Sequence, residues 1–161
     1  MGESNGEGRV ERRLAELGLT LPPVATPVAA YVPAITAGSL VMTSGQLPMV
    51  DGALPETGKV GEGAGLVSPD RAKELAATCA LNALAAVASK VGDLDRVRVV
   101  KVLGFVASDP AFTGQSGVIN GASELLGQVL GEDGVHARSA VGVAVLPLDS
   151  PVEVEITVEV R

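Results

Sequence analysis

An arginine near the C-terminus has the surroundings of an anion-binding group. Arg138 lies in the valine-rich run 137–145, which predicts a strand. The two-residue period of a strand places it on one face with Ala140, Gly142 and Ala144. The side chains of these three residues are no larger than a methyl group. A guanidinium can hold a carboxylate with two hydrogen bonds. The alternative interpretation is an edge-strand arginine in solvent.

A second valine-rich run, residues 152–160, also predicts a strand and carries an acidic candidate. Glu153 shares one face with Glu155, Thr157 and Glu159, opposite a face of Val and Ile. An amphipathic strand with one solvated face has the same pattern. The strand pattern alone therefore leaves a structural and a functional role open for Glu153.

The positions of Arg138 and Glu153 depend on how these two strands meet. A simple hairpin centred near Asp149, in the connection that begins at Pro147, would place Arg138 opposite Val160. The two candidates would then be separated by roughly 23 Å in one chain. A site that uses both would need a second subunit. The valine face of the first strand is expected to pack in the core.

Composition narrows the class of protein. The chain of 161 residues has a net charge of -7 and only 2% aromatic residues, which argues against a nucleic-acid partner, since phosphates need a basic surface and single strands need stacking platforms. No uninterrupted apolar run is long enough to span a bilayer, and the polar N-terminus lacks a signal-peptide core. The single cysteine, Cys79, excludes an internal disulfide, so we expect a cytoplasmic protein.

Several common catalytic arrangements have no basis in the sequence. His136 is the only histidine, so we expect no metal site within one chain. Ser139, His136 and Asp149 could be written as a triad, but they fall on a strand and a turn, and a triad is defined by geometry. No glycine motif matches a dinucleotide or phosphate loop, and we expect no cofactor. Cys79 is predicted to be a small buried hydrophobe.

The expected elements are a helix, two strands, a helix, a strand, a helix and two strands. The longest helix should run from Ser68, its N-cap, to about Val91. An almost continuously apolar strand over 97–107 fits the middle of a sheet, and a weaker helix is expected over 108–130. This order predicts an α+β fold in which two helices cover one side of one sheet.

The N-terminal part of the chain is less regular. Residues 1–8 are expected to be disordered, and residues 9–161 to form a single domain. A short helix is predicted over 10–17 and a hairpin over 31–44 that turns at Ala37-Gly38. The glycine-rich segment 51–67 is predicted to be a surface loop.

Three segments resemble the RidA/YjgF family, also called the endoribonuclease L-PSP family. They are Gly38-Ser-Leu-Val-Met-Thr-Ser-Gly-Gln-Leu-Pro48, Gly92-Asp-Leu-Asp-Arg-Val97 and Ala137-Arg-Ser-Ala-Val-Gly-Val-Ala-Val-Leu-Pro147, the last followed by Val-Glu-Val-Glu-Ile. The resemblance covers roughly 31–161, with a domain core over 30–161. It implies a chorismate-mutase-like α+β fold and a homotrimer with clefts between subunits. The N-terminal helix and the glycine-rich loop are similar to a longer subgroup.

The resemblance also implies an activity and a site. Family members hydrolyse reactive enamines and imines, such as 2-aminoacrylate, to a 2-keto acid and ammonia without a cofactor. By this resemblance Arg138 would hold the substrate carboxylate and Glu153 would position the attacking water. The remaining cleft-lining positions it implies are Tyr31, Ser44, Gly45, Asn120 and the backbone amide of Ala140.

Two departures from the family pattern leave the substrate open. Ala140 occupies a position that is commonly Cys, and His136 replaces a Pro. An alternative function is a trimer that binds 2-keto acids or similar small carboxylates without turnover. Endoribonuclease activity is a third candidate, against which the acidity of the chain argues.

Overall fold

The helices and strands follow the predicted order. The computed structural model describes residues 7–24 and 30–161, so most of the segment predicted to be disordered (1–6 of 1–8) lies outside the described residues. The elements are α1 (Arg9–Glu16), β1 (Ala34–Ala37), β2 (Leu40–Thr43), α2 (Pro69–Val91), β3 (Val97–Ala107), α3 (Gln115–Leu130), β4 (Ala137–Val143) and β5 (Val152–Val160). Short 3₁₀ turns lie at Leu94–Arg96, Gly131–Gly134 and Pro147–Asp149.

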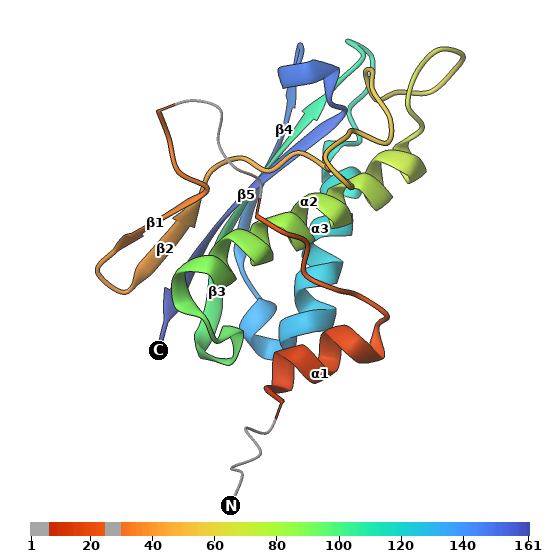
Figure 1. Cartoon of the computed structure of the whole chain (residues 1–161). Helices are drawn as coiled ribbons and strands as arrows, with labels where there is room; N and C mark the ends of the chain where they lie inside the picture. Colours follow the sequence, from red (N-terminus) through yellow and green to blue (C-terminus); the bar gives the residue numbers. More distant parts are fainter. Residues whose placement is uncertain (1–6, 25–29) are drawn as a thin grey trace, which may run out of the picture.

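One mixed sheet joins the strands in the order β1-β2-β5-β3-β4 (Figure 1). Paired strands are antiparallel, except that β3 and β4 are parallel. The predicted hairpin of the two C-terminal strands is therefore wrong, because β5 lies between β2 and β3 while β4 lies on the far side of β3. This order gives β3 a partner on each edge, whereas a β4–β5 hairpin would leave backbone groups of β3 without partners.

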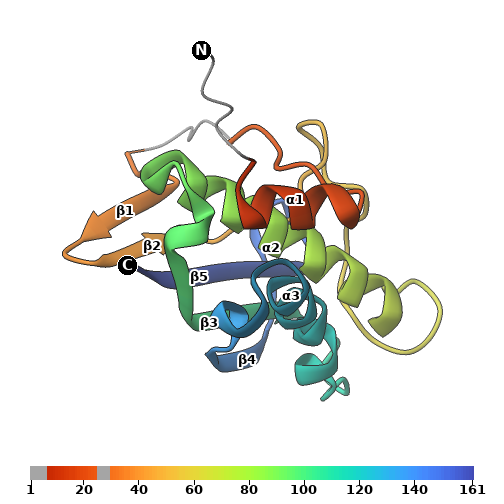
Figure 2. The same cartoon turned by 90° about the horizontal axis from the view of Figure 1, so that it is seen from below.

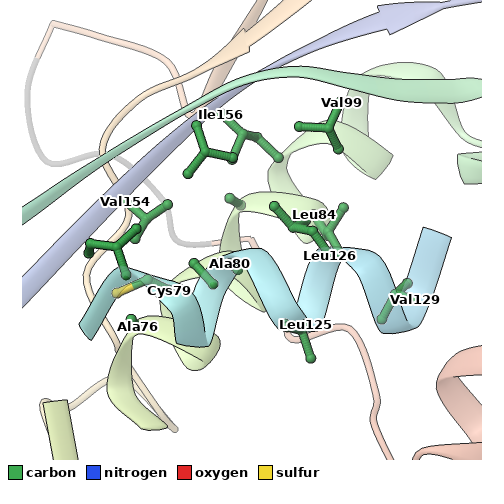
Figure 3. Packing of buried hydrophobic residues seen from close by; sticks show 14 of the residues in the cluster. Ala76, Cys79, Ala80, Leu84, Val99, Leu125, Leu126, Val129, Val154 and Ile156 are labelled. Carbon is green, nitrogen blue, oxygen red and sulfur yellow. The ribbon is translucent and has the colours of Figure 1, made fainter. Parts of the chain in front are cut away.

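Two helices cover one face of this sheet, as predicted. α2 and α3 lie side by side on it, and α1 packs against α3 (Figure 2). The buried side chains of α2 and α3 meet the inward-facing residues of β3 and β5, and Figure 3 shows Leu84 and Leu126 near Ile156 and Val99. The opposite face of the sheet has no helix over it within the described chain.

α2 begins and ends as its sequence predicts. Ser68 Oγ accepts a hydrogen bond from the Arg71 N–H at 3.2 Å, and Gly92 ends the helix at a φ of 73°. α2 has the length and apolar composition of a membrane-spanning helix, but its buried face packs in the core of this fold. Cys79 lies on that face and is buried, as predicted, and burial raises the pKa of its thiol well above the usual value.

α3 begins later than predicted. Residues 108–114 are not helical: Ser108 still pairs with Val60, a turn follows in which the Asp109 carboxylate accepts a hydrogen bond from the Ala111 N–H at 3.0 Å, and Gly114 precedes the first helical residue, Gln115. A short polar side chain that bonds to the backbone two residues on competes with helix formation. The end at Leu130 agrees with the prediction.

α1 is attached to the rest of the fold by polar contacts at both helix ends. The Asp95 carboxylate accepts from the N–H groups of Arg9 and Val10, each at 2.7 Å, and so caps a helix that starts 86 residues earlier in the chain. Arg9 and Arg13 donate to the carbonyl groups of Leu130 and Gln128 at the end of α3. Val10 and Leu14 are buried beneath these contacts. This helix therefore stabilises the C-terminal end of α3.

Candidate functional site

The arginine-bearing face of β4 packs toward α3, and the prediction that the valine face packs in the core is wrong. Arg138 is in register with Val102, which is fully buried, whereas Val141 remains 40% exposed. The small residues beside Arg138 let the start of α3 approach, since a Cβ on Gly142 would lie 2.8 Å from Gln115 Nε2. The small residues of β4 therefore make room for α3 as well as for the guanidinium of Arg138.

The Arg138 guanidinium is held by α3. Nη1 donates to Asn120 Oδ1 at 2.8 Å and to Ser123 Oγ at 3.2 Å, and Nη2 donates to the Ser116 carbonyl oxygen at 3.3 Å. A guanidinium has five N–H donors. Among the described residues, the Nε–H and one Nη2–H have no acceptor. Three N–H groups of Arg138 are thus occupied by α3, and two remain free to donate. Two is the number of hydrogen bonds that a carboxylate accepts from an arginine fork.

Asn120 was implied by the family resemblance, whereas sequence reasoning missed Ser116 and Ser123. These three residues are spaced at i, i+4 and i+7 along α3, which places them on one stripe of the helix beside β4. That polar stripe, next to the apolar positions at Val118 and Ile119, is the signal that could have identified them. Ala140 shares the face of β4 that carries Arg138 and packs against the core.

Glu153 and Gly45 form a second group of predicted site residues. Glu153 is in register with Phe105, so it lies on the sheet face opposite the helices. Gly45 lies directly against it, because a Cβ on Gly45 would fall 1.7 Å from Glu153 Oε1. No described residue accepts a hydrogen bond from the Gly45 N–H.

Ser44 and Tyr31 extend this second group. Ser44 Oγ donates to the Val32 carbonyl oxygen at 2.6 Å, which ties the segment before β1 to the end of β2. Tyr31 is 55% exposed and lines, with Ser44 and several apolar side chains, an open groove of about 510 Å³. The apolar lining residues are Ala30, Val32, Ile35 and Met42.

The surroundings of Glu153 increase its affinity for a proton. Partial burial raises the pKa of this carboxyl group above its usual value, and the neighbouring charge of Glu155 raises it further. A carboxyl group with a raised pKa can exchange a proton with substrate or water closer to neutral pH than an exposed glutamate can.

One chain does not bring Arg138 and Glu153 together. Their register partners on β3, Val102 and Phe105, are three residues apart and therefore face opposite sides of the sheet. The backbone separation is about 14 Å, three residues along and two strands across, instead of the 23 Å expected for a hairpin. The conclusion that one subunit cannot build a site from both residues is unchanged, but its main reason is the opposite orientation of the two side chains.

The other arrangements considered from the sequence do not form. Ser139 accepts a hydrogen bond from Lys101 Nζ at 3.1 Å on the open face, while His136 contacts Ser123 of α3, so no triad with Asp149 exists. Within residues 7–24 and 30–161, no group of three His, Cys, Asp or Glu side chains is placed to hold a metal ion.

The fold and the two residue groups can be compared with known proteins. The family model described as "YjgF/chorismate_mutase-like, putative endoribonuclease" matches residues 11–160. One mixed sheet with helices on one face is the chorismate-mutase-like α+β architecture. The chain therefore belongs to the YjgF family, which confirms the predicted family and fold class.

Individual relatives agree with this assignment. Protein TCP17 of Trypanosoma cruzi is 45% identical over 156 residues, covering 96% of each chain. The crystal structure of Atu1372 from Agrobacterium tumefaciens is 46% identical with a TM-score of 0.86, covering 95% of this chain and 93% of that one. Escherichia coli TdcF, crystallised with bound serine, is 25% identical with a TM-score of 0.59, covering 88% and 94%.

Proposed function

We propose that the protein is a cofactor-independent hydrolase of reactive enamines and imines of the 2-aminoacrylate type, which releases a 2-keto acid and ammonia. The observation that carries the proposal is the half-satisfied guanidinium of Arg138. Three of its donors are fixed by α3, and the remaining two suit the carboxylate of a small substrate. The bound serine of TdcF, a small amino acid with a carboxylate, supports a ligand of this size in the family.

The proposed active site is composite and lies between subunits of a homotrimer. Arg138, Asn120 and Ala140 would come from one subunit, and Tyr31, Ser44, Gly45 and Glu153 from its neighbour. The opposite orientation of Arg138 and Glu153 supports this, because neither can reach the other within one chain. The open sheet face also exposes Ile35, Met42 and Val141, a surface suited to contact with another copy.

The chemistry requires little machinery. Arg138 binds the carboxylate, and charge-assisted hydrogen bonds of this kind contribute about 1.5–3 kcal/mol. Glu153 takes a proton from the water that adds to the imine carbon. With the imine protonated, Glu153 gives this proton to the nitrogen of the addition product and takes the new hydroxyl proton as the C–N bond breaks, so that ammonia leaves and the C=O bond of the keto acid forms. Such proton transfer contributes about 10² to 10⁴-fold in rate. The Gly45 N–H is a further donor beside the reacting atoms.

Complementation between variants tests the composite site. Arg138→Ala and Glu153→Gln should each lower the rate of release of keto acid and ammonia from freshly generated 2-aminoacrylate by about 10²-fold or more. Unfolding and refolding an equal mixture should restore about one quarter of the wild-type activity, because random assembly pairs an intact Arg138 with an intact Glu153 at that frequency. Activity that stays absent in mixed oligomers, or a monomeric protein, would contradict the proposal.

A non-catalytic trimer that binds 2-keto acids is the second candidate. It is favoured by Ala140, which leaves the arginine side of the site without the thiol common in the family. This function predicts that 2-oxobutyrate binds and that binding needs Arg138, while imine hydrolysis never exceeds the rate in buffer. An endoribonuclease would instead cleave RNA after repurification, which a chain of net charge -7 disfavours.

A further inference from the structure

Behind Arg138, a polar chain runs away from the proposed site. Ser123 Oγ, which accepts from Arg138 Nη1, lies 2.9 Å from His136 Nε2. His136 Nδ1 lies 2.6 Å from the Gly134 carbonyl oxygen. The chain therefore links β4, α3 and the turn at Gly131–Gly134 through three side chains and one backbone group.

When the imidazole is neutral, the chemistry of these groups fixes the direction of each hydrogen bond. A carbonyl oxygen can only accept, so His136 Nδ1 carries the proton and donates to Gly134. In that imidazole tautomer Nε2 is an acceptor, and the Ser123 hydroxyl donates to it. The Ser123 oxygen then keeps its lone pairs for Arg138. Every bond points the same way, from guanidinium to hydroxyl to imidazole to carbonyl.

This direction has a consequence for Arg138. A serine hydroxyl can rotate and can turn its hydrogen toward other acceptors, such as Asn120 Oδ1, which binds the same nitrogen of Arg138. When His136 accepts the hydroxyl proton, Ser123 is held as an acceptor for Nη1. The guanidinium is then anchored on its Nη1 side, and the two unused donors face one direction.

We infer that Ser123 and His136 are positioning residues that hold the Arg138 fork in the orientation that receives the substrate carboxylate. The inference rests on the proposed role of Arg138. His136 stands where the resemblance implies a proline, which could not accept this bond, so the pair is a feature of this chain. Neither residue touches the substrate, and each acts through Arg138.

Binding of a charged ligand and its uncharged analogue separates positioning from general structural support. The probes are 2-oxobutyrate and 2-oxobutanamide, measured by calorimetry on the full-length protein. Ser123→Ala and His136→Phe should weaken 2-oxobutyrate binding at least about threefold, and should leave amide binding unchanged, since only the carboxylate uses the oriented fork. His136→Gln, whose side-chain oxygen can accept from Ser123, should restore most of the affinity.

A double-variant comparison and a matched control complete the test. Ser123→Ala should add no further loss in an Arg138→Ala background, because a positioning residue has no effect once its target is gone. Ser89→Ala, the same change on α2 at a hydroxyl that donates to the Ala86 carbonyl group, should leave both affinities unchanged. Equal losses for both ligands, or an additive loss in the double variant, would overturn the inference.

The outcome for Arg138 alone shows which statement has failed. If Arg138→Ala does not weaken 2-oxobutyrate binding, the proposed function itself is wrong. If Arg138→Ala weakens it while Ser123→Ala and His136→Phe do not, the carboxylate site stands and only the positioning role is wrong.

Discussion

The Glu153 carboxylate rests against the backbone of Gly45. A Cβ on Gly45 would fall 1.7 Å from Glu153 Oε1 and 2.7 Å from its carboxyl carbon. This contact joins the end of the β1–β2 hairpin to β5 and sets the position of the only acidic group in the proposed site. The backbone at Gly45 does not have a positive φ, so the feature that favours glycine there is the proximity of Glu153 and not the backbone conformation.

Gly45→Ala should therefore displace the carboxylate and leave the fold intact. The atom in the way is the end of a flexible side chain, which can move. Misplacement of a catalytic group by about 1 Å can cost about 10²-fold, so we expect a fall in kcat of that order with an unchanged melting temperature. Combined with Glu153→Gln, the change should add no further loss. An unaltered kcat would show that Glu153 need not occupy this position.

Glu153→Gln should lower activity and raise stability at neutral pH. Because the pKa of Glu153 is raised in the folded chain, the folded state binds its proton more tightly than the unfolded state does. The contribution of Glu153 to stability therefore falls as pH rises from about 4.3, its unfolded value, through the folded pKa.

Melting temperatures measured across this pH range, at one protein concentration, test the point. The advantage of Glu153→Gln over the wild type should grow from acidic to neutral pH. Glu159→Gln, on the same face of β5, provides a control for the loss of one negative charge. A constant difference between wild type and Glu153→Gln would contradict the raised pKa.

Two glycines of α3 should respond in opposite directions to alanine. A Cβ on Gly121 would lie 1.9 Å from the Lys73 carbonyl oxygen of α2, a backbone atom that cannot move without shifting the helix. Nothing lies within 4 Å of a Cβ on Gly117. Gly117→Ala should stabilise the fold by up to about 1 kcal/mol through helix propensity. Gly121→Ala should destabilise it by about 1–3 kcal/mol through overpacking. Urea titration of both variants measures the difference.

Asp95→Ala should loosen α1. The Asp95 carboxylate caps this helix through Arg9 and Val10, and loss of such a cap costs about 1 kcal/mol. Although burial acts to raise the pKa of Asp95, the Val10 and Arg9 N–H groups outweigh it and lower this pKa. The stabilisation of the fold by the Asp95 carboxylate is therefore present at pH values above the pKa of Asp95 in the unfolded chain. It is lost as the pH falls through the pKa of Asp95 in the folded chain.

Hydrogen exchange of the α1 amides, compared between Asp95→Ala and Asp93→Ala, would measure the effect. Asp93 bonds within its own turn, to the Asp95 N–H, so its loss should leave the α1 amides protected. Equal protection of α1 in the Asp95 variant and the wild type would show that the cap is unimportant.

The sequence by itself determined the type and order of the elements. Ser68, Pro69 and Gly92 mark the ends of α2 through local capping and backbone preferences, and the alternating residues of β5 fix which side faces the core. Each of these signals acts within a few residues of the chain. The motif around Arg138 likewise indicated the family that the comparison then confirmed.

Only the tertiary structure decided which strands pair and which face of β4 is buried. Strand pairing depends on contacts between distant segments, and β3 gained β5 on one edge and β4 on the other. That choice turned Arg138 toward α3 and Glu153 away from it, because strands in register share the orientation of their partners. The role of the polar stripe of α3 that holds Arg138 also depends on packing. Local sequence sets the faces of a helix, but only packing selects the strand that each face meets.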